Sequence, residues 1–150
     1  MNRRSLLFLG AALALAPLAV PAGAADKVFT GLVPGVGTGG YDVVAYQTDN
    51  RAEPGDAAIT AKHEGVEYRF ASEANRQAFE ASPAKYLPQY GGYCAWAVSQ
   101  GYTAKGDPEA WSVVDGKLYL NYSKGVRSQW SKDAAGNITK GDSNWPKVLN

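Results

Sequence analysis

Residues 63–86 read HEGVEYRFASEANRQAFEASPAKY, and their local signals decide the fold. Glu64 and Gly65 form a two-residue loop between the strand-like runs AITAKH and VEYRF, which predicts a β-hairpin. Ser72 then stands where a helix N-cap is expected, and Pro83 ends the helix that Ser72 begins. A hairpin that leads into a short helix is typical of a small α+β domain.

A second hairpin is predicted further along the chain. The runs AWSVV and KLYLNY flank Asp115 and Gly116, a strong signal for a type I′ turn, so we expect hairpins over 58–70 and 110–122. Ser123 can cap a following helix. The predicted fold is a small single α+β domain in which antiparallel hairpins pack against short helices. No internal repeat is evident.

The N-terminal segment, residues 1–24, predicts export. Arg3 and Arg4 precede an apolar run over 6–20, and small residues then predict cleavage after Ala24. The run is shorter than the roughly 20 residues of a membrane-spanning helix. The arginine pair resembles a twin-arginine signal, and an ordinary Sec signal is the alternative. The expected location of the mature, soluble chain is a bacterial periplasm.

Length and charge narrow the function classes. Removing the signal peptide removes two of the 15 Lys and Arg residues, so 13 positive charges meet 14 negative ones and the formal net charge changes from +1 to −1. This balance does not favour binding to nucleic acid or to an anionic membrane surface. We expect a Gly-rich arm over 25–40 and one domain with a C-terminal extension over 41–150, of unknown oligomeric state.

The glycines of this arm do not predict a nucleotide site. Residues 35–40 read GVGTGG, which has the spacing of a dinucleotide-binding loop. Such a loop needs a strand before it and a helix after it. Here the strand-like run YDVVAY follows at 41–46, so we expect a strand there instead.

Residues 63–86 resemble a YHS domain. The residues that match the family pattern are Gly65, Tyr68, Phe70, Ser72, Phe79, Pro83 and Tyr86. The flanking runs YDVVAY, YGGYCAWA, GDPEAW, VDGKLYLNY and NWP are similar to a longer group of exported bacterial YHS proteins. The resemblance therefore covers most of the chain after the signal peptide.

This resemblance implies a metal-handling domain whose cysteines bind soft or borderline metals. The corresponding positions here hold Ala45, Ala71 and Asn75, which cannot replace thiolate ligands. We therefore expect zinc or copper(I) to bind much more weakly than in relatives with three cysteines. His63, the only histidine, and Cys94 remain as candidate ligands for copper or zinc.

Cys94 is the only cysteine, and two roles are open for it. Some members of the longer exported group carry selenocysteine at this position, which implies a reactive thiol. A short helix over 93–100 would place Cys94 in its first turn, where the pKa of a thiol falls toward neutrality. We then expect it partly exposed at the floor of a pocket, forming a mixed disulfide or sulfenic acid. Its neighbours Ala95, Ala97 and Val98 are equally typical of a packed core.

Five further residues are candidates for ligand binding: Tyr41, Asp42, Tyr90, Tyr93 and Trp96. The aromatic residues either wall a pocket beside the thiol or belong to the core. Asp42 either orients a ligand or accepts hydrogen bonds from nearby backbone amides.

Two classes of function follow. In the first, the protein is a periplasmic thiol-dependent redox or metal-handling protein, and Cys94 reacts with a small-molecule or protein thiol partner. In the second, it is a non-catalytic accessory module of the cell envelope that binds a ligand or a protein, with Cys94 in the core. Whether the chain is an enzyme, and whether it holds a cofactor, stays open.

Overall fold

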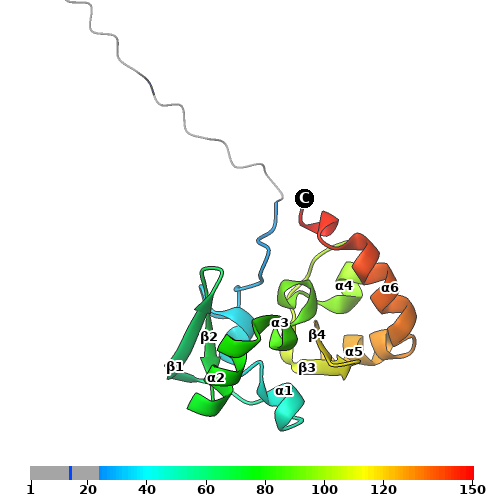
Figure 1. Cartoon of the computed structure of the whole chain (residues 1–150). Helices are drawn as coiled ribbons and strands as arrows, with labels where there is room; N and C mark the ends of the chain where they lie inside the picture. Colours follow the sequence, from blue (N-terminus) through cyan, green and yellow to red (C-terminus); the bar gives the residue numbers. More distant parts are fainter. Residues whose placement is uncertain (1–13, 15–23) are drawn as a thin grey trace, which may run out of the picture.

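The structure, a computed structural model, describes residue 14 and residues 24–150, so most of the predicted signal peptide lies outside the described residues. It confirms the α+β prediction, because two antiparallel hairpins pack with short helices (Figure 1). Among the described residues, no helix is long and apolar enough to cross a membrane.

The first hairpin and its helices lie on one side of the molecule (Figure 1). In chain order the elements are the 3-10 turn η1 (Gly37–Gly40), α1 (Ala45–Thr48), β1 (Asp56–His63), β2 (Val66–Phe70), α2 (Glu73–Ala81) and α3 (Pro83–Tyr86). The hairpin turn and the helix start agree with the sequence. Glu64 and Gly65 have positive φ, as a type I′ turn requires, and the Ser72 side chain accepts a hydrogen bond from Asn75 N.

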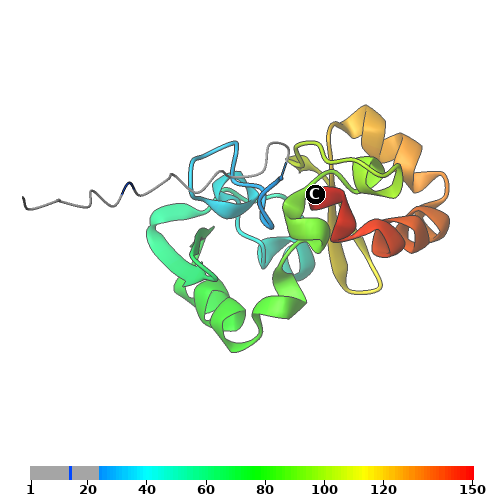
Figure 2. The same cartoon turned by 90° about the horizontal axis from the view of Figure 1, so that it is seen from above.

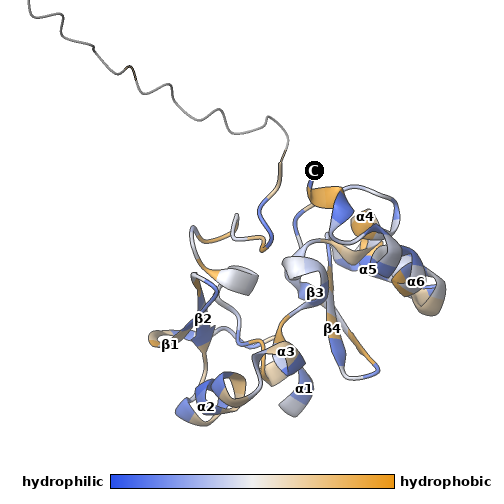
Figure 3. Ribbon diagram, turned by 45° about the horizontal axis from the view of Figure 1, so that its top comes forward, coloured by the Kyte–Doolittle hydropathy of each residue, from blue (hydrophilic) through white to orange (hydrophobic). Residues whose placement is uncertain are grey.

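The second hairpin and its helices lie beside the first half (Figure 2). The elements are η2 (Gln89–Gly92), α4 (Ala95–Ser99), β3 (Asp107–Val114), β4 (Lys117–Asn121), α5 (Lys124–Ser131), α6 (Ala134–Asn144) and η3 (Lys147–Leu149). Asp115 and Gly116 again have positive φ, and the Ser123 side chain accepts from Val126 N. In Figure 3 the helices α2 and α6 carry both hydrophilic and hydrophobic residues, as helices packed on a core do.

The two halves repeat one arrangement, and the expectation of no internal repeat is therefore wrong. We call residues 37–81 the first repeat and residues 89–131 the second repeat. Each runs from a 3-10 turn through a short helix, a hairpin and a Ser-capped helix. Hairpin residues correspond at an offset of 51, so that the irregularity between Asp56 and Thr60 recurs between Asp107 and Trp111.

The core positions correspond as well. Tyr68 and Phe79 of the first repeat match Tyr119 and Trp130 of the second, and all four are buried. The rings of each pair are also in contact in a tilted arrangement, with centroids 5.3 Å and 5.2 Å apart. The molecule therefore buries one similar aromatic pair under each hairpin, which offsets the small size of two-stranded sheets.

The predicted strand at 41–46 is wrong. Tyr41 makes only an isolated bridge to Pro54, and the chain then turns into α1. The physical reason is Asp42, whose Oδ1 accepts hydrogen bonds from Val44 N and Ala45 N and thereby starts a helical turn.

The first residues of the Gly-rich arm pack on the second repeat and on the C-terminal segment. Ala25 N donates to Leu149 O, Phe29 N donates to Gly91 O, and the Tyr93 hydroxyl donates to Asp26 O. Gly91 has a φ of 62°, and a Cβ there would collide with the carbonyl oxygen of Lys27. Only glycine therefore allows this close approach of the arm.

Candidate functional site

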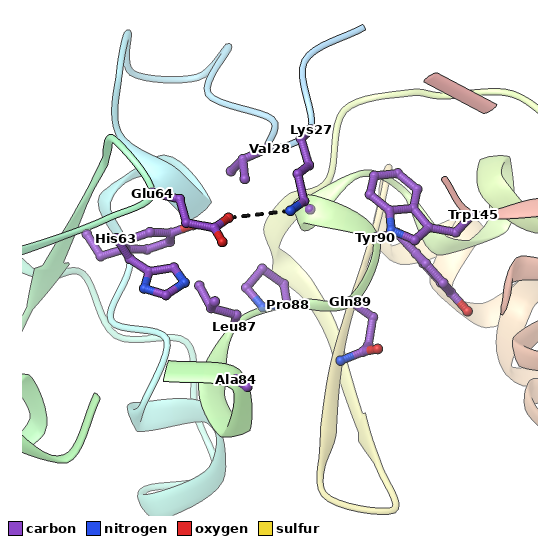
Figure 4. Close-up of a pocket in the computed structure, with 12 residues that line it drawn as sticks. Lys27, Val28, His63, Glu64, Ala84, Leu87, Pro88, Gln89, Tyr90 and Trp145 are labelled. Carbon is purple, nitrogen blue, oxygen red and sulfur yellow. Dashed lines mark ion pairs between the residues drawn. The ribbon is translucent and has the colours of Figure 1, made fainter. Parts of the chain in front are cut away.

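A cavity of about 260 Å³ lies between the two repeats (Figure 4). We call it the inter-repeat cavity. Its walls come from the N-terminal arm, the β1–β2 turn, β2, the segment from α3 to η2, and the C-terminal segment. The lining residues are Lys27, Val28, His63, Glu64, Tyr68, Ala84, Leu87, Pro88, Gln89, Tyr90, Gly91 and Trp145.

One ion pair closes part of this cavity. Lys27 Nζ of the arm lies 3.5 Å from Glu64 Oε2 of the β1–β2 turn (Figure 4). The two side chains are 73% and 59% exposed, so the pair contributes less than about 1 kcal/mol and opens easily. The side chains of Lys27 and Glu64 can therefore separate at this edge of the cavity without a large loss of stability.

Aromatic side chains form the less polar part of the cavity. Tyr90 packs against Trp145 with ring centroids 6.0 Å apart, and its hydroxyl donates to Asp142 Oδ1 at 2.8 Å. Burial raises the pKa of Tyr68 to about 12, and burial together with the bond to Asp142 raises the pKa of Tyr90. Both phenol groups therefore stay protonated at physiological pH, both rings offer apolar faces, and the bond to Asp142 fixes the Tyr90 hydroxyl.

Cys94 is in the core, and the predicted partial exposure is wrong. The residue is only 1% exposed, and it is the N-cap of α4 rather than a residue of its first turn. Burial raises the pKa of the Cys94 thiol, although hydrogen bonds from backbone amides act in the opposite direction. The effect of desolvation on the pKa is larger than that of the amide hydrogen bonds. The prediction that the thiol titrates near neutrality is therefore also wrong.

The Cys94 sulfur is nevertheless surrounded by hydrogen-bond partners. It accepts from Tyr122 N at 3.2 Å and from Ala97 N at 3.5 Å, and the thiol donates to Asn121 Oδ1 at 3.6 Å. One side of the residue lines a second, apolar cavity of about 290 Å³, which we call the thiol pocket. Its other lining residues are Trp96, Tyr102, Ala104, Tyr122 and Val126.

The candidate residues from the sequence are divided among several places. His63 and Tyr90 line the inter-repeat cavity, whereas Cys94 and Trp96 line the thiol pocket. The other three line neither cavity: Tyr41, Asp42 and Tyr93.

Tyr41, Asp42 and Tyr93 have structural contacts instead. The Tyr41 hydroxyl donates to Glu109 Oε1 at 2.9 Å, a bond that raises the pKa of Tyr41 and links the two repeats. Asp42 accepts from backbone amides, as one of its two interpretations predicted. The ring of Tyr93 packs between Phe29 and Trp145 in the core.

No metal centre is formed by the described part of the chain, since residues 24–150 contain no group of three or more His, Cys, Asp and Glu side chains that could hold an ion. His63 and Cys94 line different cavities, and the imidazole of His63 instead packs edge-on against Phe79 at 6.0 Å. The two candidate ligands therefore do not form a partial site together.

The sequence reasoning missed several lining residues, including Lys27, Glu64 and Trp145 of the inter-repeat cavity and Asn121 beside the thiol. A signal for the repeat was present in the sequence. The run GGYDVVA at 39–45 aligns with GGYCAWA at 91–97, so that Cys94 stands at the position equivalent to Asp42. This alignment indicates the repeat. Lys27 and Trp145 had no such signal, because only long-range packing brings them to the cavity.

Cys94 is expected to resist alkylation in the native protein. Iodoacetamide at neutral pH should label it far more slowly than in urea, because the thiol is buried and largely protonated. Intact mass spectrometry over time measures the difference. Equal labelling rates in the native and unfolded states would show that the thiol is accessible.

Comparison of the chain with protein-family models, curated proteins and solved structures finds no match. The resemblance to exported YHS proteins stays a prediction from the motifs in residues 41–146.

Proposed function

We propose that this protein is a non-catalytic binding module of the bacterial cell envelope, which holds a small amphipathic molecule in its inter-repeat cavity. The observation that carries the proposal is the cavity itself, where aromatic faces and a few polar groups converge from separate segments. Such a composition is typical of ligand pockets, which often lie between structural units.

The size and chemistry of the cavity limit the ligand. A volume of about 260 Å³ lies just below the roughly 300–1,000 Å³ of most ligand pockets, so the ligand is small. Tyr68, Tyr90 and Trp145 offer faces to an apolar or aromatic body. The polar groups of Lys27, His63 and Glu64 also line the cavity and would bind the polar end (Figure 4).

The burial of Cys94 favours this proposal over thiol-dependent turnover. A thiol that is 1% exposed, with a pKa raised by burial, is a poor nucleophile at neutral pH. Export to the periplasm, and membership of the exported YHS group, are parts of the proposal that rest on the N-terminal segment and on the motifs.

A library of small organic fragments, screened by protein NMR, tests the proposal. We expect aromatic fragments with one polar group to shift the amide signals of His63, Leu87 and Gly91, because these residues line the cavity. The exposed Ala84 also lines it, so Ala84→Trp is expected to fill the space and abolish these shifts.

Ala135→Trp is the matched control, because Ala135 is an exposed helical alanine on α6 that does not line the cavity. This variant should bind the same fragments as the unmodified protein. If no fragment shifts the cavity residues, or if Ala84→Trp binds as well as Ala135→Trp, the inter-repeat cavity is not a ligand site.

A further inference from the structure

The thiol pocket carries exposed aromatic rings at the surface of the second repeat. Tyr102 and Tyr122, which both line this pocket, are 52% and 48% exposed. They are two of the four large hydrophobic side chains that are exposed in the described part of the chain. The half-buried Trp96 adds a third aromatic ring to the wall. Exposed apolar side chains that gather around one cavity are typical of a binding site.

The fold itself does not require these rings. In the first repeat the residue equivalent to Trp96 is Val44, according to the alignment of GGYDVVA with GGYCAWA. The residue equivalent to Tyr122 is Ala71, at the offset of 51 that relates the two hairpins. The same arrangement of hairpin and helices therefore forms with much smaller side chains at both positions. The aromatic wall is a property of the second repeat alone.

A positive charge lies beside this aromatic wall. Lys105 Nζ is 5.0 Å from the centroid of the Tyr122 ring. Lys105 is exposed, and within residues 24–150 it forms no ion pair with a carboxylate. A contact between a cation and an aromatic ring is weak at an exposed site. The ammonium group is therefore available to a stronger, negatively charged partner.

The segments that form the pocket carry no negative charge. Residues 94–106 and 116–126 contain Lys105, Lys117 and Lys124 but neither Asp nor Glu. Asp107 follows Lys105 closely in the chain, but its Oδ1 already accepts a hydrogen bond from Glu109 N at 2.8 Å. No carboxylate lines the pocket. The pocket thus combines an apolar, aromatic interior with a cationic edge, and this combination complements an aromatic anion.

We propose that the thiol pocket is a second ligand site, which binds a small aromatic carboxylate. The aromatic body of the ligand packs against Trp96, Tyr102 and Tyr122, and its carboxylate accepts a hydrogen bond from Lys105 Nζ. The volume of about 290 Å³ limits the ligand to a small molecule. Aromatic rings also bind organic cations, but here the ammonium of Lys105 would repel a cation. This inference does not depend on the inter-repeat cavity.

Titration of the folded protein with benzoate, followed by NMR, tests the proposal. We expect the amide signals of Ala104, Tyr122 and Val126 to shift, because these residues line the pocket. Benzamide has nearly the same shape without the charge and is expected to bind at least about threefold more weakly. Benzylamine, a cation at neutral pH, should bind more weakly still. Absence of these shifts with benzoate, or affinity for benzamide or benzylamine equal to that for benzoate, would overturn the proposal.

Substitutions of Lys105 test the position of the carboxylate. Lys105→Met should bind benzoate no more tightly than benzamide, whereas Lys105→Arg keeps the charge and should keep the preference for benzoate. Lys124→Met is the matched control, because Lys124 is exposed on α5 and does not line the pocket. An undiminished preference in Lys105→Met, or an equal loss in Lys124→Met, would contradict recognition of the carboxylate by Lys105.

Two further variants separate this site from the inter-repeat cavity. Tyr102→Ala removes an exposed ring of the thiol pocket and is expected to weaken benzoate binding about fivefold. Ala84→Trp fills the inter-repeat cavity and should leave the benzoate shifts unchanged. Loss of these shifts in Ala84→Trp, or full affinity in Tyr102→Ala, would show that benzoate does not bind in the thiol pocket.

Discussion

Replacing Trp130 with alanine is expected to lower the free energy of unfolding by about 3–5 kcal/mol. Trp130 lies on α5, is only 1% exposed, and packs on Tyr119 in the core of the second repeat. Alanine would leave a large cavity that the surrounding rigid elements can fill only in part. Equilibrium unfolding in urea, followed by circular dichroism, measures the loss.

Trp130→Phe is the matched control. Phenylalanine is the residue at the corresponding position of the first repeat, Phe79, and it keeps much of the buried ring surface. It also removes the indole N–H of Trp130, which is buried without a hydrogen-bond partner. We therefore expect a clearly smaller loss than for alanine. Equal losses for the two variants would show that ring burial does not determine the stability at this position.

Replacing Asp42 with alanine is expected to cost a similar amount, on the order of 4 kcal/mol, because each buried donor left unpaired costs about 1–3 kcal/mol. The substitution would remove the acceptor of Val44 N, Ala45 N, Ala71 N and Asn75 Nδ2 at once. The same urea titration measures this loss.

Two milder variants show whether the hydrogen bonds to the Asp42 carboxylate cause this loss of stability. Asp42→Asn keeps one oxygen acceptor and should cost less than alanine. Ser72→Ala removes only the N-cap of α2, which accepts from Asn75 N, and should cost about 1 kcal/mol. A loss for Asp42→Ala no larger than that for Ser72→Ala would contradict a structural role for the carboxylate.

The hairpins and capped helices could be predicted because their signals are local. Glu64–Gly65 and Asp115–Gly116 adopt positive φ within the turn itself, and Ser72 and Ser123 satisfy amides three residues away. The structure of residues 41–46 could not be predicted from periodicity, because an apolar run of this length is compatible with either a strand or a buried helical turn.

The state of Cys94 needed the tertiary structure. Its sequence neighbours suggested amide donors on α4, and the structure contains one of them, Ala97 N. Its other partners, Asn121 Oδ1 and Tyr122 N, come from the end of β4 and the residue after it, and this strand also covers the thiol. Burial depends on segments that are distant in sequence, so local reasoning overestimated the exposure of the thiol and had the direction of its pKa shift wrong.

The sequence by itself determined the turns, the caps, the α+β class and the presence of a single thiol, because residues close in the chain decide each of these. Only the tertiary structure decided that Cys94 is buried, at the position of the second repeat that corresponds to Asp42 of the first. It also decided that Lys27, His63, Tyr90 and Trp145 surround one cavity. The physical reason is that burial and cavities arise where the N-terminal arm, both repeats and the C-terminal segment pack together, and no local pattern records that packing.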